Sequence, residues 1–428
     1  MTATAFTALF VTAFATMVGT RLWLARRQIA HVAGHRDRVP RAFADRVGLE
    51  AHRKAADYTT AKQTLLCVET IVDALVLVAL TFGGGLAAIL AWTAALPVGA
   101  LWQDAILIGA IVAAGAIAGL PFSWYSTFVI EERFGFNRMT ISLWLADLAK
   151  GIALGVAFGL PLLLLVLWLM REAGGAWWLM AWGVWMAFQL LVLVLYPTLI
   201  APMFNRFEPL PAGDARARIE SLLARCGFAS SGLFVMDGSK RSGHGNAYFT
   251  GFGRAKRVVF FDTLLARLSG DELEAVLAHE LGHFKLRHVM KRIGLSAALS
   301  LAFLAALAWL MREPWFYAGL GIPQSLVADA ISRPGVALSL FLLVFPVFTF
   351  ALSPLAASYS CRHEFEADAF AAQTASGAAL VQALVKLYED NAATLTPDPV
   401  HSAFYDSHPP AAIRIHRLQA LAAGAPAD

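Results

Sequence analysis

Charged residues are scarce in this chain of 428 residues: they make up 15% of it, against about 25% of an ordinary soluble domain. Hydrophobic residues reach 58%. This balance excludes a disordered chain, a collagen-like repeat and a coiled coil, and it argues strongly against a wholly soluble globule. The formal net charge of +4 is too small to attract a nucleic-acid polyanion by itself, so we expect no nucleic-acid partner.

Cysteines are few, and no basic residue comes early in the chain. Three cysteines, Cys67, Cys226 and Cys361, cannot build a disulfide framework. No Lys or Arg precedes Arg21, although a cleaved signal peptide carries its positive charge ahead of the apolar run. We therefore expect the first apolar segment to be a retained membrane helix.

Long apolar runs dominate the rest of the chain. A membrane-spanning helix needs about 20 mostly apolar residues, and seven stretches meet that requirement. We expect seven membrane helices and a lipid bilayer around them. The stretches are roughly 4–24, 64–94, 101–126, 143–170, 176–204, 291–311 and 335–357.

Basic residues predict the orientation. Residues 26–54 carry eight Lys or Arg residues, whereas the loop between the second and third stretches carries none. The positive-inside rule therefore places residues 26–54 in the cytoplasm and the N-terminus outside. Counting crossings then places residues 205–290 and 358–428 in the cytoplasm too. The short loops favour a bacterial cytoplasmic membrane. The expected segments are 1–204 (five helices), 205–290 (an α/β segment), 291–357 (two helices) and 358–428 (C-terminal helices).

Ionisable residues interrupt two of the apolar stretches. Glu69 and Asp73 lie four residues apart, and Asp147 and Lys150 lie three apart. Such groups usually face a bundle interior or a water-filled cavity. Two interpretations stay open: interfacial charges or an internal ion pair, and a hydrated intramembrane cavity. The acidic and basic residues at 131–133 are expected to form a helix-end charge cluster.

A zinc-ligand motif occupies residues 279–283, His-Glu-Leu-Gly-His. The Ser-Gly-Asp-Glu run ahead of it has capping-box spacing, and apolar residues at helical intervals predict a helix of about four or five turns. On that helix His279 and His283 share a face and could bind one Zn²⁺. Glu280 is rotated by about 100° from His279, so it could act as a base on water without being a ligand.

A catalytic zinc site usually has a third protein ligand, which we expect in residues 358–370. Glu364 and Asp368 lie four residues apart on one helical face. One could bind the metal while the other supports a ligand imidazole. We favour Glu364 as the ligand, and spacing alone leaves Cys361 and His363 open.

Two β-rich runs, 246–250 and 257–262, flank a Gly-containing turn and predict a hairpin just before the zinc helix. An exposed edge there could hold an extended peptide across the metal, with Asn246, Ala247 and Tyr248 as its contacts. The alternative is a hairpin that only packs on the helix.

A proline pair after His408 predicts the start of a helix, with Arg414 about two turns beyond His408. A cationic group near the zinc could stabilise an oxyanion. Taken alone, His408 is more typical of an exposed cap. His288 and His244 are expected at the surface, with a pocket role as the alternative.

Taken together, these motifs resemble the type I CAAX prenyl endopeptidases, integral-membrane zinc proteases of the gluzincin class. The resemblance covers nearly the whole chain. It rests on the seven apolar stretches and on the motifs EERFGFN (131–137), IAPMFNRF (200–207), SGHGNAYFTGFG (242–253), FDTLL (261–265), HELGHFKLRH (279–288), the Glu364-to-Asp368 spacing, and SHPP with Arg414.

The resemblance implies one Zn²⁺ per chain, a ring of seven helices around a large water-filled chamber, and a zinc domain on its cytoplasmic side. It implies that Glu280 is the catalytic base and that Asp368 supports a ligand. The implied zinc ligands are His279, His283 and Glu364, and the implied substrate or transition-state contacts are Asn246, His408 and Arg414.

We therefore expect a zinc endopeptidase that cuts near the C-terminus of CAAX-type substrates, prenylated or not. Two alternatives stay open. One is a quality-control metalloprotease that acts on unprenylated membrane proteins. The other is a non-enzymatic membrane protein with a structural zinc, closed by Cys361 or His363 as a fourth ligand. Glu280 argues against the second, because a structural site has no need of a base.

Overall fold

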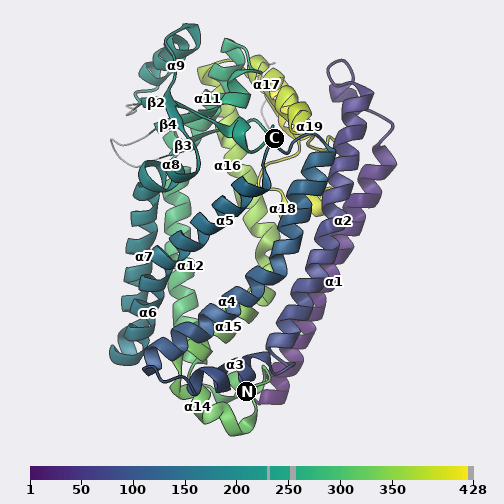
Figure 1. Ribbon diagram of the computed structural model, residues 1–428. Coiled ribbons are helices and arrows are strands. Elements are labelled where there is room, and N and C mark those ends of the chain that lie inside the picture. The colour runs from purple at the N-terminus through teal and green to yellow at the C-terminus, as the bar shows by residue number, and fades with distance from the viewer. Residues whose placement is uncertain (229–231, 251–256, 423–428) are drawn as a thin grey trace.

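The computed structural model describes residues 1–228, 232–250 and 257–422, and the fold is mainly helical (Figure 1). Seven helical segments of this part of the chain are long and apolar enough to cross a membrane, as predicted. They are α1 (Ala3–His35), α2 (Leu49–Leu80), α4 (Ala100–Tyr125, continued to Glu131), α5 (Ile141–Leu154) joined to α6 (Leu160–Glu172), α7 (Trp177–Leu195, within the span Gly174–Phe204), α12 (His288–Leu310) and α15 (Pro334–Thr349) joined to α16 (Ser353–Thr374).

The second span differs from its predicted limits of 64–94. Helix α2 ends at Leu80, and residues 85–94 form a separate helix, α3 (Gly85–Ala94). Three consecutive glycines cause the break. Gly84 has φ 77°, and a Cβ at Gly83 would lie 2.7 Å from the Ala79 carbonyl oxygen. At its other end α2 continues through polar residues to Leu49, because a helix does not stop where its apolar stretch stops.

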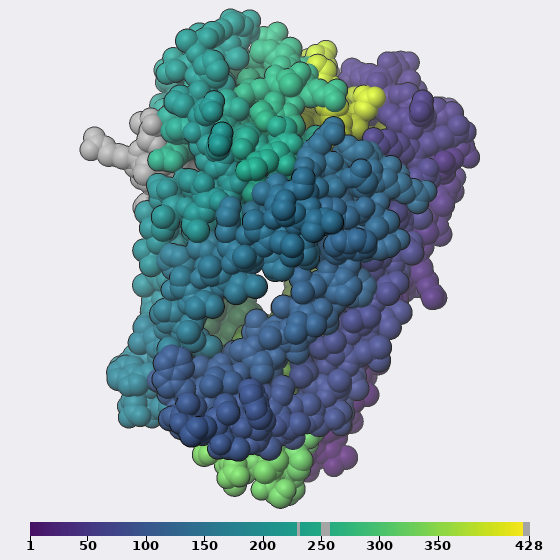
Figure 2. Space-filling model, viewed as in Figure 1, coloured from purple at the N-terminus to yellow at the C-terminus, as the bar shows by residue number. Residues whose placement is uncertain are grey.

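The spanning helices surround a hollow, and part of several spans packs in an apolar cluster that includes Phe10, Leu107 and Leu340. In six of the seven spans, between 6% and 17% of the most apolar stretch is buried. Figure 2 shows an opening through the helical part of the molecule, framed by segments from the first half of the chain. The predicted ring of helices around a chamber is confirmed. Within α2, Asp73 is exposed and Glu69 is half-buried.

The other intramembrane pair has a protein partner. Asp147 of α5 accepts hydrogen bonds from Arg241 Nε at 2.8 Å and Arg241 Nη2 at 3.0 Å. Lys150 Nζ lies 3.9 Å from Asp147 and donates to the Met203 carbonyl at 2.8 Å. This pair therefore matches the ion-pair interpretation, and it ties α5 to the segment that follows the second strand.

A four-stranded sheet lies at the end of the molecule opposite the N-terminus (Figure 1). Its strands are β1 (Phe207–Pro209), β2 (Gly232–Met236), β3 (Ala247–Thr250) and β4 (Arg257–Phe261), in the order β1-β2-β4-β3. Strands β3 and β4 are antiparallel, with Ala247 opposite Phe260, which confirms the predicted pairing. The Gly-containing turn expected between them, residues 251–256, lies outside the described residues.

Helices pack on this sheet and build the core around the site. They are α9 (Asp214–Arg225), α11 (Gly270–Lys285), α17 (Gly377–Asp390) and α19 (Ala411–Ala422). Ile219, Leu277 and Phe260, from α9, α11 and β4, are each at most 1% exposed in one shared apolar cluster. Helix α16 leaves the membrane part and runs against α11. A Cβ at Gly282 would lie 3.0 Å from Ala367 Cα, so this glycine permits the close approach of the two helices.

Candidate metal centre and active site

Helix α11 forms as its sequence predicts. The Ser269 hydroxyl accepts from the Glu272 N–H at 3.4 Å, and the Ser269 N–H donates to Glu272 Oε2 at 2.7 Å, which completes the capping box. The helix then runs for 16 residues to Lys285. His279 and His283, one turn apart, project from the same face, with their ring centroids 4.9 Å apart.

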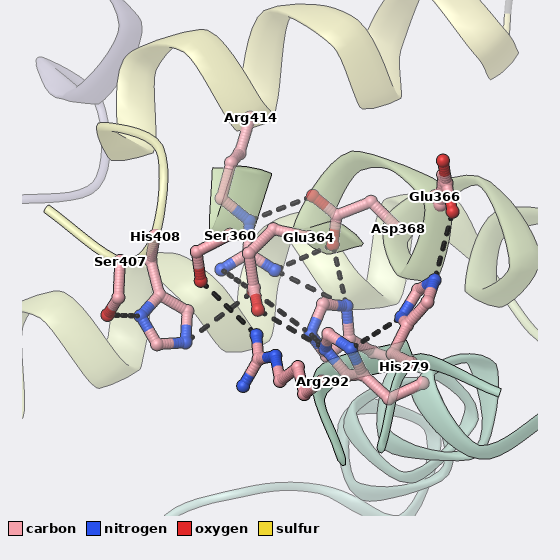
Figure 3. Close-up of polar contacts among 11 residues, drawn as sticks. His279, Arg292, Ser360, Glu364, Glu366, Asp368, Ser407, His408 and Arg414 are labelled. Carbon is pink, nitrogen blue, oxygen red and sulfur yellow. Dashed lines mark hydrogen bonds and ion pairs between the residues drawn. The ribbon is translucent and has the colours of Figure 1, made fainter. Parts of the chain in front are cut away.

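Glu364 of α16 meets both imidazoles. Its Oε2 lies 3.4 Å from His279 Nε2, and its Oε1 lies 3.2 Å from His283 Nε2. The two Nε2 atoms are 3.3 Å apart. Three potential ligand atoms therefore converge on one point, from two helices that are far apart in the sequence (Figure 3).

The donor set fits a divalent metal. Glu364 is 3% exposed, and its Oε2 is a buried carboxylate oxygen without a hydrogen-bond donor. Such an oxygen is costly to bury unless a cation satisfies it. Two imidazoles and one carboxylate also form a ligand set of catalytic zinc sites, which keep a fourth position open.

The other candidate ligands lie elsewhere. Cys361 Sγ donates to the Asp406 carbonyl at 3.5 Å. The ring of His363 stacks on His288 at 4.0 Å. Of the residues that sequence spacing left open, the structure brings Glu364 to the two histidines and turns Cys361 and His363 to other partners.

Asp368 lies one turn beyond Glu364 and supports His279. Its Oδ1 is 2.8 Å from His279 Nδ1, the ring nitrogen turned away from the ligand cluster. Burial opposes protonation of His279, but the Asp368 and Glu364 carboxylates outweigh it and raise the imidazole pKa to about 9. A carboxylate behind a ligand imidazole holds the ring in one orientation and makes it a stronger donor.

Arg414 closes the far side of Asp368. Its Nε and Nη2 donate to the two Asp368 oxygens at 2.8 and 2.6 Å, and both side chains are nearly fully buried. Its Nη1 lies 3.8 Å from Glu364 Oε2. The predicted helix begins at Ala411, and the Pro410 carbonyl accepts from the Arg414 N–H, so the prolines precede the helix instead of opening it. Arg414 therefore lies in the first helical turn, closer to the start than expected.

His408 stands at the mouth of the site. Its side chain is 60% exposed, and its Nε2 lies 3.5 Å from Glu364 Oε2. Its Nδ1 contacts the Ser407 hydroxyl at 3.0 Å (Figure 3). An exposed imidazole this close to the ligand cluster can reach a substrate atom held there.

A cavity of about 300 Å³ reaches the ligand cluster at His279. Glu280 lines it beside His279, and burial raises the pKa of the Glu280 carboxyl above its ordinary value. A raised pKa brings a carboxylate closer to the neutral range, where general bases are most effective. The cavity is also lined by Asn246, Ala247, Tyr388, His408 and Arg414.

The residues at the start of the edge strand β3 differ in their access to the cavity. Asn246 is exposed at the cavity, and Ala247 lines it. The Tyr248 side chain lies on the opposite face of β3, where its ring packs edge-on against Phe261 and its hydroxyl contacts Met236. Successive residues of a strand point to opposite faces, so Tyr248 could meet a peptide at the cavity only through its backbone.

Several residues near the site escaped sequence reasoning. His288, expected at the surface, is 1% exposed and contacts His283. His244 contacts Glu131 and Asn391, at 3.3 and 3.2 Å, so Glu131 is a partner of the sheet domain and not just part of a helix-end cluster. Five residues is not a contact spacing on a helix, so no local signal placed His288 beside His283. For Tyr388 we find none either.

Two family models cover nearly the whole chain. One, described as "CAAX prenyl protease N-terminal, five membrane helices", matches residues 28–206. The other, "Peptidase family M48", matches residues 209–422. The second match contains α11, α16 and α19, which carry the ligand cluster and its supports.

Curated relatives agree with the family models. The chain is 35% identical over 327 residues to CAAX prenyl protease 1 of Saccharomyces cerevisiae, covering 74% of this chain and 72% of the relative. It is 38% identical to the CAAX prenyl protease 1 homolog of Arabidopsis thaliana, covering 71% and 70%. A crystal structure of S. mikatae Ste24p is similar with a TM-score of 0.89 at 29% identity, covering 96% of this chain and 99% of that one. The chain thus belongs to the CAAX prenyl protease family of M48 peptidases and is an integral-membrane metalloendopeptidase.

Proposed function

We propose that this metalloendopeptidase uses one Zn²⁺ to cleave a peptide bond near the C-terminus of CAAX-type substrates, with a preference for prenylated ones. The observation that carries the proposal is the convergence of His279, His283 and Glu364 beside a cavity that Glu280 lines and that β3, an edge strand in the described part of the sheet, borders. Bound there, Zn²⁺ would act as a Lewis acid on the scissile carbonyl and on water.

The protein's own groups would perform the remaining steps. Glu280 takes the proton of the attacking water and passes it to the leaving amine. His408 and Arg414 offer positive charge or N–H donors to the oxyanion. Both lie close to the metal ligands, with His408 Nε2 3.5 Å and Arg414 Nη1 3.8 Å from Glu364 Oε2. Asp368 keeps the His279 ring in place.

The strand β3 would bind the peptide backbone. In the described part of the sheet β3 pairs with β4 on one side, and its other side is an edge. An extended peptide could add to that edge as a further strand, and Asn246 could hydrogen-bond to it. The prenyl chain, being apolar, would occupy the hollow between the membrane helices (Figure 2).

We further propose that the site faces the cytoplasm, in a bacterial cytoplasmic membrane, with the N-terminus outside. The N-terminus and the sheet lie at opposite ends of the molecule, which agrees with an odd number of crossings between them and the positive-inside rule (Figure 1). Reporter fusions test this orientation. A fluorescent protein fused after the C-terminus should fluoresce, whereas a phosphatase that is active only after export should stay inactive there. The reverse pattern would contradict the orientation.

The decisive experiment compares a farnesylated CAAX peptide with its unmodified twin. Purified full-length protein should cleave the farnesylated peptide faster, and Glu280→Gln should keep its zinc and lose cleavage. Asp271→Asn, an exposed acid on the same helix, is the matched control and should cleave normally. Equal cleavage of both peptides would favour the quality-control role, for which unprenylated membrane proteins are the substrates. Normal cleavage by Glu280→Gln would contradict the mechanism.

A further inference from the structure

A strained turn places His288 beside the site. It is the first residue of α12 and follows Arg287, whose φ of 57° and ψ of 33° lie in the left-handed region. Residues other than glycine seldom adopt this conformation, because the Cβ crowds the next carbonyl oxygen. The turn lets α12 start immediately after α11 and returns the His288 ring to His283.

The His288 ring makes a contact at each of its nitrogens. Its Nδ1 lies 2.9 Å from His283 Nδ1, and its Nε2 lies 2.9 Å from Glu366 Oε2. His283 presents its other nitrogen, Nε2, to the ligand cluster. The three side chains therefore form a continuous series that ends at the metal centre.

With a metal on His283 Nε2, the positions of the hydrogens follow. A ligand imidazole binds metal through the lone pair of one nitrogen and carries its hydrogen on the other, so His283 Nδ1 is the donor. His288 Nδ1 must then accept. The hydrogen of the neutral His288 ring is consequently on Nε2, where it is donated to the Glu366 carboxylate.

Glu366 is held in place as the final acceptor. It lies two residues after Glu364 on α16 but contacts a different imidazole (Figure 3). Arg362 Nε donates to its Oε1 at 3.2 Å, and Lys291 Nζ lies 3.7 Å from its Oε2. Both neighbouring cations favour a negatively charged Glu366, which can only accept hydrogen bonds.

The same residues do not suit a second metal. His288, His363 and Glu366 have donor atoms close enough to share an ion. However, the two rings stack with an interplanar angle of 10° and centroids 4.0 Å apart. In-plane lone pairs of parallel rings run side by side instead of converging on one cation. The stack therefore holds the His288 ring flat and in position for His283.

We propose that His288, supported by Glu366, is a positioning residue for the metal ligand His283. It holds the His283 ring so that Nε2 points at the metal, and the Nδ1 hydrogen bond increases the donor strength of that nitrogen. The inference rests on the proposed metal centre. Residues in this kind of supporting position contribute about 10- to 100-fold to metal affinity.

The test measures zinc affinity of the full-length, detergent-purified protein by competition with a chelator, and the absorption spectrum of the Co²⁺-substituted protein. His288→Asn places an acceptor oxygen where Nδ1 lies and loses only the Glu366 contact, so it should bind zinc more tightly than the other two variants and, like Glu366→Leu, no more than about 10-fold more weakly than wild type. His288→Gln places its polar end near Nε2, and His288→Ala has neither group. Both should bind zinc about 10- to 100-fold more weakly and alter the Co²⁺ spectrum.

A structural role alone would weaken Asn, Gln and Ala variants equally, and that result would overturn the proposal. Glu366→Leu is the variant to use if those at position 288 do not fold, because Glu366 is 32% exposed. It should lose about 10-fold in affinity, and unchanged affinity would count against the proposal. His283→Ala separates the two hypotheses. If it keeps wild-type affinity, the metal centre itself is wrong; if it loses zinc while His288→Ala binds normally, only the positioning role is wrong.

Discussion

Replacing Arg414 by methionine should destabilise the protein and weaken metal binding together. Arg414 and Asp368 are 5% and 3% exposed and share two hydrogen bonds, of 2.8 and 2.6 Å. Removing one partner of a buried ion pair costs about 3–5 kcal/mol, because the remaining charge stays buried without compensation. Asp368 would retain its contact with His279, so we expect a loss near the lower end, about 3 kcal/mol.

Unfolding of detergent-purified variants provides the measurement. Arg414→Met and Asp368→Leu should each unfold more easily than wild type, whereas the double variant should lose less than the sum of the two. The difference, the coupling free energy, is expected at about 1–3 kcal/mol for residues in direct contact. Arg216→Met is the control, since its ion pair with Glu220 is exposed and should contribute less than about 1 kcal/mol.

Additive effects would refute this reasoning, because they would mean that each residue acts without the other. Wild-type unfolding of Arg414→Met would refute it as well. Zinc affinity, measured on the same samples, shows whether losing the Arg414–Asp368 pair also weakens metal binding through His279. We expect it to fall, because Asp368 without Arg414 is free to change its position behind that ring.

Three further predictions concern removal of the metal, the pH dependence of stability and the backbone conformation at Arg287. Chelation should abolish cleavage and lower the unfolding temperature, and added Zn²⁺ should restore both, because binding to the folded state alone stabilises it. Burial alone would raise the pKa of Asp398, but Arg27 and two backbone N–H groups outweigh it and hold the pKa below its ordinary value. This stabilisation is complete above about pH 4 and is lost as pH falls through the lower folded-state pKa, so melting temperatures from pH 7 to 3 should decline less steeply for Asp398→Asn. At Arg287, glycine should be tolerated, whereas valine should cost about 1–2 kcal/mol of stability and weaken zinc binding. Unfolding and chelator competition measure the two effects. Equal behaviour of Arg287→Gly and Arg287→Val would contradict the strained-turn argument.

Much of the fold could be predicted because it depends on local patterns. Apolar length identified seven spans, since the bilayer sets one length requirement for every helix. The capping box and the histidine spacing located α11 and two donors on one face. Glycines at 83–85 carried a signal for the break between α2 and α3, but the apolar run across it outweighed them in the prediction.

The site was only partly predictable, for a physical reason. Sequence spacing establishes which residues share one helix face, so it paired His279 with His283 and Glu364 with Asp368. It does not establish which face of α16 meets α11, so Cys361 and His363 stayed open as ligands until helix packing at Gly282 placed Glu364 beside the imidazoles. Sequence reasoning favoured Glu364 in advance, and the family resemblance then selected it.

Sequence alone determined that this chain crosses a membrane, carries a helix with a His-Glu-x-x-His motif and belongs with metalloproteases, because hydropathy and helical periodicity are properties of neighbouring residues. Tertiary structure decided what surrounds that helix. The series from His283 through His288 to Glu366 joins the three helices α11, α12 and α16, with His288 and Glu366 78 residues apart, and the Arg414–Asp368 pair adds α19. Those contacts depend on how helices pack and on one left-handed residue at position 287, and neither is encoded in a short stretch of sequence.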